Sequence, residues 1–106
     1  MKSYRLTPRA ADGLWRILVY VEDRFGAAIT DRVLAEIESA FDLLVERPQI
    51  GHRREELTSD PRIRFWSVGP TLIAYRASGD AIEVLFVERG SMDWERLMDE
   101  LPRQSQ

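Results

Sequence analysis

Residues 62–89 read RIRFWSVGPTLIAYRASGDAIEVLFVER, and this stretch decides the fold. It is dominated by β-branched, aromatic and aliphatic residues, whose side chains suit a half-buried pleated strand. Val-Gly-Pro at 68–70 and Ser-Gly-Asp at 78–80 interrupt the run, and glycine and proline at such places favour turns. The pattern predicts three short strands joined by two tight hairpins, which together form an antiparallel meander.

An amphipathic helix is predicted well ahead of the meander. Thr7 and Pro8 are typical of a helix start, because threonine caps free amides and proline needs no donor in the first turn. Gly26 is expected to end this helix. Its apolar residues recur at spacings of three and four, which is typical of a helix with one buried face. This apolar stripe consists of Ala11, Leu14, Trp15, Leu18, Val21 or Glu22, and Phe25.

A second helix follows within a residue or two and reaches Arg47, where Pro48 stops it. Its apolar stripe consists of Ile29, Val33, Ile37, Ala40, Phe41 and Leu44. The one-glycine connection predicts an antiparallel hairpin, whose joint apolar face needs a second layer. Within the chain, only the meander can supply that layer. The residues expected between hairpin and sheet are Leu14, Trp15, Leu18, Ile37, Phe41 and Leu44.

Short elements are predicted at both ends of the chain. Residues 3–7 alternate between polar and apolar, as in a short first strand. Asp93 is typical of an N-cap for a short final helix that Pro102 ends, before a frayed RQSQ tail. The apolar side of that helix would carry Trp94, Leu97, Met98 and Leu101. We therefore expect one α+β domain over residues 1–106, with its core in residues 3–101. Its two layers would comprise an N-terminal strand, an antiparallel helical hairpin, a three-strand antiparallel meander and a short C-terminal helix.

Composition limits the kinds of protein this can be. The chain contains no cysteine, so neither a disulfide nor a cysteine-based metal site is available. Its longest apolar runs fall far short of the ~20 residues that span a bilayer, and its start does not resemble a signal peptide. We therefore expect a cytoplasmic protein without a membrane segment. A chain of 106 residues buries only a small core, so association with a partner or a second copy would not be surprising.

Charge is distributed unevenly along the chain. Residues 47–76 carry six arginines against three acids, a balance of +3, while the rest carries a balance of −6. The positive segment, which includes Arg53 and Arg54, could meet a polyanion or an acidic protein tail. The alternative is that these arginines simply solubilise a loop and a strand face. An isoelectric point near 5.2 argues against a general nucleic-acid binder.

Few residues suggest chemistry. His52 is the one histidine and has no obvious nucleophile partner, so the sequence predicts no catalytic residue, no metal site and no cofactor. Arg64, Tyr75, Arg76 and Arg89 fall on adjacent predicted strands. On one sheet face they could clamp a phosphate or a carboxylate. The alternative is that Tyr75 packs in the core with its hydroxyl at the rim, while the arginines shield the outer face.

Four segments together resemble the ParE branch of the ParE/RelE toxin superfamily, the toxins of type II toxin-antitoxin (plasmid stabilisation) modules. They are YRLTPRAADGLWRILVYVEDRFG at 4–26, ERPQIGHRREEL at 46–57, RIRFWSVGPTLIAYRA at 62–77 and AIEVLFVERGSMDW at 81–94. The shared features are an aromatic-x-leucine start followed by x-Pro-x-Ala, then Phe-Gly, Pro-x-x-Gly, Val-Gly and Tyr-Arg. Each motif is short, and their order and spacing carry the resemblance.

The resemblance implies a cognate antitoxin that wraps the toxin as helix and strand, and it allows a higher-order toxin-antitoxin complex. For ParE-like members it also implies poisoning of DNA gyrase, which blocks replication and growth. Members of the RelE branch instead cleave messenger RNA in the ribosome. The residues expected to contact an antitoxin or the target are Arg53, Arg54, Arg64, Tyr75, Arg76 and Arg89.

One departure from the family bears on this choice. The last strand commonly ends in arginine, two apolar residues and His-Gly, whereas here Phe86 and Arg89 replace the arginine and the histidine. In ribonuclease members, residues near this place serve acid–base or phosphate-binding roles. One lysine, Lys2, and the low isoelectric point also argue against docking into ribosomal RNA. The sequence therefore favours a gyrase-binding toxin without direct nucleic-acid binding. A RelE-type ribosome-dependent endoribonuclease and a non-toxic antitoxin-binding homologue remain the alternatives.

Overall fold

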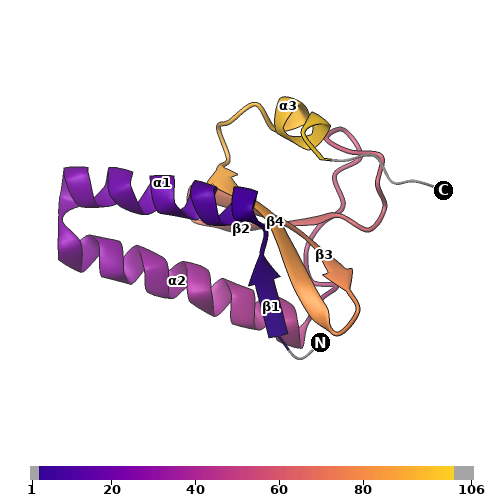
Figure 1. Cartoon of the computed structure of the whole chain (residues 1–106), viewed down its shortest axis with the longest axis horizontal. Helices are drawn as coiled ribbons and strands as arrows, with labels where there is room; N and C mark the ends of the chain where they lie inside the picture. Colours follow the sequence, from indigo (N-terminus) through magenta and orange to yellow (C-terminus); the bar gives the residue numbers. More distant parts are fainter. Residues whose placement is uncertain (1–2, 102–106) are drawn as a thin grey trace.

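The computed structural model describes residues 3–101 as a four-stranded sheet with helices on both faces (Figure 1). The elements are β1 (Ser3–Leu6), α1 (Pro8–Phe25), α2 (Ala27–Glu46), β2 (Arg64–Val68), β3 (Thr71–Ser78), β4 (Ala81–Arg89) and α3 (Trp94–Asp99). This order confirms the predicted α+β class, the helical hairpin and the meander. The predicted helix stop at Pro102 and the frayed tail lie outside the described residues.

The sheet has the strand order β1-β4-β3-β2. Strands β2, β3 and β4 pair antiparallel, and Gly69 and Gly79 form their turns with φ values of 55° and 61°. Glycine adopts this left-handed region without the steric cost that a Cβ would bring. Strand β1 pairs parallel with β4, from Ser3 opposite Ala81 to Leu6 opposite Val84. The first strand therefore lies at one edge of the sheet, and α1 starts from that edge.

Helix α1 leaves the sheet at a capped turn. The Thr7 hydroxyl accepts the amide of Ala10 at 3.1 Å and donates to the carbonyl of Leu85 at 3.1 Å, so the predicted N-cap also ties the helix to β4. The helix then runs beside the remaining part of β4. A Cβ at Gly13 would collide with the Val87 carbonyl oxygen and crowd the Glu88 carboxylate. The absence of a side chain at Gly13 thus permits the close approach of helix and strand.

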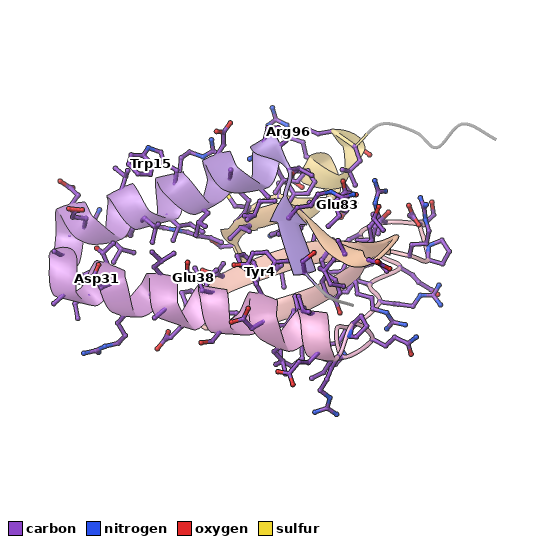
Figure 2. The ribbon with its side chains drawn as sticks, turned by 60° about the horizontal axis from the view of Figure 1, so that its bottom comes forward. Tyr4, Trp15, Asp31, Glu38, Glu83 and Arg96 are labelled. Atoms are coloured by element: carbon purple, nitrogen blue, oxygen red, sulfur yellow. The ribbon has the colours of Figure 1, made fainter. Side chains whose placement is uncertain are left out.

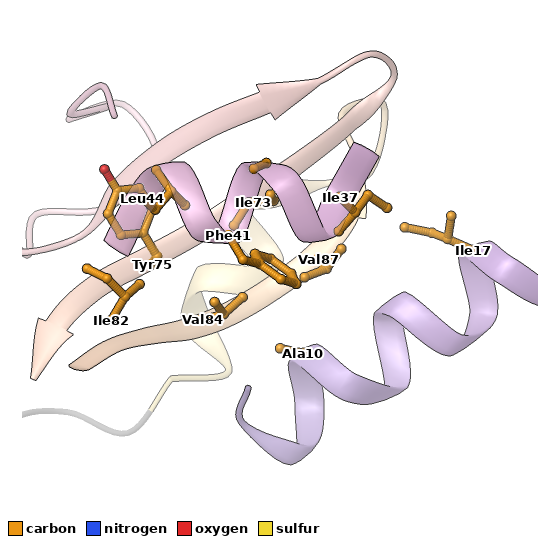
Figure 3. Packing of buried hydrophobic residues seen from close by; sticks show 11 residues of the cluster. Ala10, Ile17, Ile37, Phe41, Leu44, Ile73, Tyr75, Ile82, Val84 and Val87 are labelled. Carbon is orange, nitrogen blue, oxygen red and sulfur yellow. The ribbon is translucent and has the colours of Figure 1, made fainter. Parts of the chain in front are cut away.

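The main core lies between the hairpin and one face of the sheet (Figure 3). Ile37, Phe41 and Leu44 of α2 are buried there, as predicted. The Phe41 ring also contacts Tyr4 of β1, with ring centroids 4.9 Å apart. The buried side chains of the sheet in this core come from β3 and β4: they are Ile73, Tyr75, Ile82, Val84 and Val87.

The predicted phase of α1 is wrong at two large residues. Trp15 is 67% exposed and projects from the outer side of the helix (Figure 2). Phe25 is 62% exposed. The buried residues of α1 are Ala10, Gly13 and Ile17, while Leu14 and Leu18 are half-buried. Apolar residues occupy positions 14, 15 and 17–21, nearly the whole circumference, so their spacing alone permitted more than one buried face.

A second core lies on the opposite face of the sheet, beneath α3. Trp94, Leu97 and Met98 of this helix are buried there, and the Asp93 carboxylate caps it by accepting the Arg96 amide at 3.2 Å. The pairing of β3 with β4 is irregular at this point. Ala74 pairs with Phe86 and the next residue, Tyr75, pairs with Val84, so Leu85 has no partner on β3. Leu85 and Phe86 both pack in this second core. The sequence predicted α3 but not the face that it covers.

Candidate functional site

A groove of about 670 Å³ opens between the far half of the hairpin and the end of the sheet. Helix α2, at 20 residues, is ~30 Å long, and β4, at nine residues, spans about the same length, but the two are displaced along each other. The far end of the hairpin projects beyond the sheet (Figure 1). Ile29 and Val33 of the predicted α2 stripe face this groove, opposite Val68 and Pro70 of the β2–β3 turn. Part of the apolar surface of the hairpin is thus left open.

Arg89 contributes a positive charge to this apolar groove. Its guanidinium carbon lies 3.7 Å from the centroid of the Tyr20 ring, and that of Arg24 lies 4.9 Å from the same centroid. Cations over an aromatic face are attracted by its electron density. Hydrogen bonding to Arg89, and the charges of Arg24 and Arg89, lower the pKa of Tyr20. Within residues 3–101, neither arginine forms an ion pair with a carboxylate.

Arg64 and Tyr75 hold the loop that follows α2. They lie opposite each other on β2 and β3. The Tyr75 hydroxyl accepts the Gly51 amide and donates to the Pro48 carbonyl, both at 2.9 Å, while Arg64 donates to the Gly51 carbonyl at 3.0 Å. Tyr75 is 1% exposed, and burial raises its pKa. Tyr75 therefore packs in the core with its hydroxyl in hydrogen bonds, as the packing alternative predicted.

The four strand residues do not converge on one face, so the clamp that the sequence left open as one alternative does not form among them. Side chains alternate along a strand, so Arg76 points away from Tyr75 to the other face, where it pairs with Glu83 of β4 at 2.9 Å. Arg89 shares the hairpin face with Arg64 but lies at the other end of the sheet. Arg89 is opposite Thr71 on β3, whereas Arg64 is opposite Tyr75, four residues further along.

The loop arginines are exposed and have acidic neighbours. Arg54 bonds Glu56 at 3.0 Å, and Arg53 lies 3.9 Å from Glu55. A third pair, Arg62 with Asp60 at 2.8 Å, holds the pKa of the Asp60 carboxyl below its usual range. All three acids of the positive segment are thus engaged within it. The binding role of Arg53 and Arg54 stays a prediction.

His52 covers the outer edge of β2. Its backbone forms two hydrogen bonds of 2.8 Å with Phe65, and its exposed ring stacks on Trp66 with centroids 6.3 Å apart.

No cluster of three or more acidic or histidine side chains suited to a metal ion occurs in residues 3–101. Over the same residues, no helix is long and apolar enough to cross a membrane.

A buried carboxylate escaped the sequence analysis. Glu88 is 5% exposed and accepts hydrogen bonds from Arg9 and from Arg16, the latter at 3.0 Å. Arg9 also bonds Glu100 at 3.0 Å, so the network joins α1, β4 and the end of α3. The sequence feature that could have indicated this buried carboxylate is an acid at the end of the otherwise apolar run VLFVE at 84–88. Such a residue needs partners to be buried.

The same α+β fold occurs among solved structures. It is similar to a solved structure described as the chromosomal ParDE TA system from P. aeruginosa, with a TM-score of 0.69 and 22% identity over 84% of this chain and 96% of that chain. At this identity the similarity concerns the fold.

Sequence similarity identifies the family. The chain is 30% identical to Toxin ParE1 of Caulobacter vibrioides, over 88% of this chain and 94% of the relative. It is 32% identical to Toxin ParE3 of the same organism, over 84% and 86%. Residues 4–94 match the family described as ParE toxin of type II toxin-antitoxin system, parDE. The chain belongs to this family, as the resemblance predicted.

Proposed function

We propose that this protein is the toxin of a type II toxin-antitoxin module, that a cognate antitoxin neutralises it, and that it acts by binding and inhibiting DNA gyrase. Membership of the ParE family supports the toxin role. The observation that carries the choice of mechanism is the dispersal of the polar residues on the sheet. Arg64, Tyr75, Arg76 and Arg89 are divided between two faces and two ends of it.

This dispersal favours a binding protein over a ribonuclease. General acid–base catalysis needs groups within hydrogen-bond reach of one reacting centre. Here Tyr75 and Arg64 are engaged with the loop at 48–51, and Arg76 is paired with Glu83 on the other face. The net charge of −3 also opposes docking to ribosomal RNA, whose affinity depends on neutralising phosphates.

The groove supports an antitoxin partner. An amphipathic helix binds a groove by inserting apolar residues that recur every three or four positions. Ile29 and Val33, one turn apart on α2, line one wall of the groove, and Val68 and Pro70 form the other, so the groove offers an apolar surface to such residues. A helix that fills the groove would remove apolar surface from water, and this surface is exposed in the protein alone. The antitoxin helix is therefore expected there.

Induced expression in a bacterial host tests this function. The expected result is growth arrest with an SOS response, because trapped gyrase leaves DNA breaks; co-expression of the antitoxin should restore growth. A host strain with the same vector but a stop codon early in the gene is the control. Normal growth at confirmed expression of folded protein would remove the toxin role. Codon-specific cuts in translated messages would instead favour the ribonuclease alternative.

A further inference from the structure

We propose that Arg89, held against Tyr20, makes the groove selective for a partner helix that carries an aspartate or glutamate between its apolar anchors. The proposal deepens the antitoxin assignment and rests on it for the identity of the partner. The chemistry of the occupant follows from the groove itself. Arg89 thus acts as a specificity-determining residue of the interface.

The size of the groove fits the side chains of one helix. Ile29, Val33 and Ile37 cover two turns of α2, ~12 Å along its axis. A helix lying in the groove would present two or three apolar residues over this length. Arg89 lies with Gly90 and Ser91 in the wall formed by the end of β4, so it faces the partner beside those anchors.

The charge of Arg89 determines which polar residue the partner helix should carry. Arg89 has no carboxylate partner within residues 3–101, as shown above for the ion pairs. A purely apolar helix would cover its guanidinium without giving it an acceptor, and an unpaired covered charge is costly. A carboxylate on the helix removes that cost. Glu36 on the α2 wall carries the opposite charge, so the partner acid belongs on the Arg89 side.

The Tyr20 ring prepares Arg89 for this contact. Stacking at 3.7 Å restricts the guanidinium before the partner arrives, and a pre-ordered side chain loses less entropy on binding. Arg24 stacks on the same ring and adds to the positive potential. A planar guanidinium can hold a carboxylate through two parallel hydrogen bonds, which a neutral residue at the same position could not do.

Selection of helices from a display library tests the proposal on the full chain. The library consists of three-turn amphipathic helical peptides with leucines at the anchor positions, and Asp, Asn or Lys at each position between them. It is selected on the unchanged protein, on Arg89→Glu, and on Arg96→Glu as a matched charge reversal on α3. Each variant is first checked for an unchanged melting transition.

The expected result is enrichment of aspartate at one position on the unchanged protein and on Arg96→Glu, and of lysine at that position on Arg89→Glu. The enriched aspartate peptide should bind Arg89→Met roughly tenfold or more weakly, and Val33→Asp should abolish its binding. The proposal would be overturned if the selected peptides showed no charge preference, or if they showed the same preference on Arg89→Glu. It would also be overturned if the enriched peptide bound Val33→Asp as tightly as the unchanged protein. The selection involves neither toxicity nor gyrase, so its outcome is independent of the growth assay.

Discussion

At the residue scale, polar side chains in the core hold segments that are distant in sequence. Tyr75 joins β3 to the loop at 48–51 through two hydrogen bonds, and its ring sits where a side chain on Gly51 would collide with it. Glu88 joins β4 to α1 through Arg9 and Arg16. Both residues therefore connect segments of the fold that are distant in sequence.

Replacing Tyr75 with phenylalanine should lower the free energy of unfolding by about 1–3 kcal/mol. The change leaves the Gly51 amide and the Pro48 carbonyl without their partner while keeping the ring in place. Urea denaturation measures the effect. Tyr4→Phe is the control, because the Tyr4 ring packs on Phe41 and its hydroxyl makes no hydrogen bond within residues 3–101. If Tyr75→Phe were as stable as the unchanged protein, the hydroxyl of Tyr75 would not be what holds the loop at 48–51 in place.

The same residue predicts a pH dependence. Burial raises the pKa of Tyr75 above its unfolded value of about 10, so the folded state favours the protonated hydroxyl. The corresponding stability is present below about pH 10 and is lost as the pH rises further, because only the unfolded chain then releases the proton. Unfolding free energies measured from pH 8 to 11 should fall more steeply for the unchanged protein than for Tyr75→Phe. Parallel curves would contradict the assignment.

At the scale of elements, the phase of α1 determines which surface the hairpin buries and which it leaves open. Phe41 on α2 is 1% exposed, whereas Trp15 on α1 is 67% exposed. Phe41→Ala should cost about 3–5 kcal/mol of unfolding free energy, because it opens a cavity in the main core. Trp15→Ala should change it by less than about 0.5 kcal/mol, as a surface substitution does. Thermal and urea unfolding of both variants test the phase, and similar losses would restore the original prediction for Trp15.

Local signals predicted the elements well. Thr7-Pro8, Gly26 and the two glycine turns mark boundaries by their own backbone preferences, so the order of helices and strands followed from the sequence. Positions that depend on several elements did not follow. Burial of Ile17 depends on where α1 lies beside β4, and the place of Arg89 depends on an irregular register upstream in that strand.

At the scale of the whole molecule, the candidate site arises where the hairpin projects beyond the sheet (Figure 1). Part of the apolar face of the hairpin stays open there as the groove, and the position of the hairpin along the sheet could not be predicted from local sequence signals. Arg89 was singled out from the sequence, but it does not converge with Arg64 and Arg76, because strand alternation and distance separate them. The family assignment rested on motifs spread along the chain, and the comparisons confirm it.

The most direct measurement of the central claim uses the purified protein, purified DNA gyrase and supercoiled plasmid. We predict that covalent gyrase–DNA complexes accumulate as the protein concentration rises. In a parallel ribosome reaction, a reporter messenger should stay intact. Unchanged gyrase activity together with cleavage of the messenger would contradict the account.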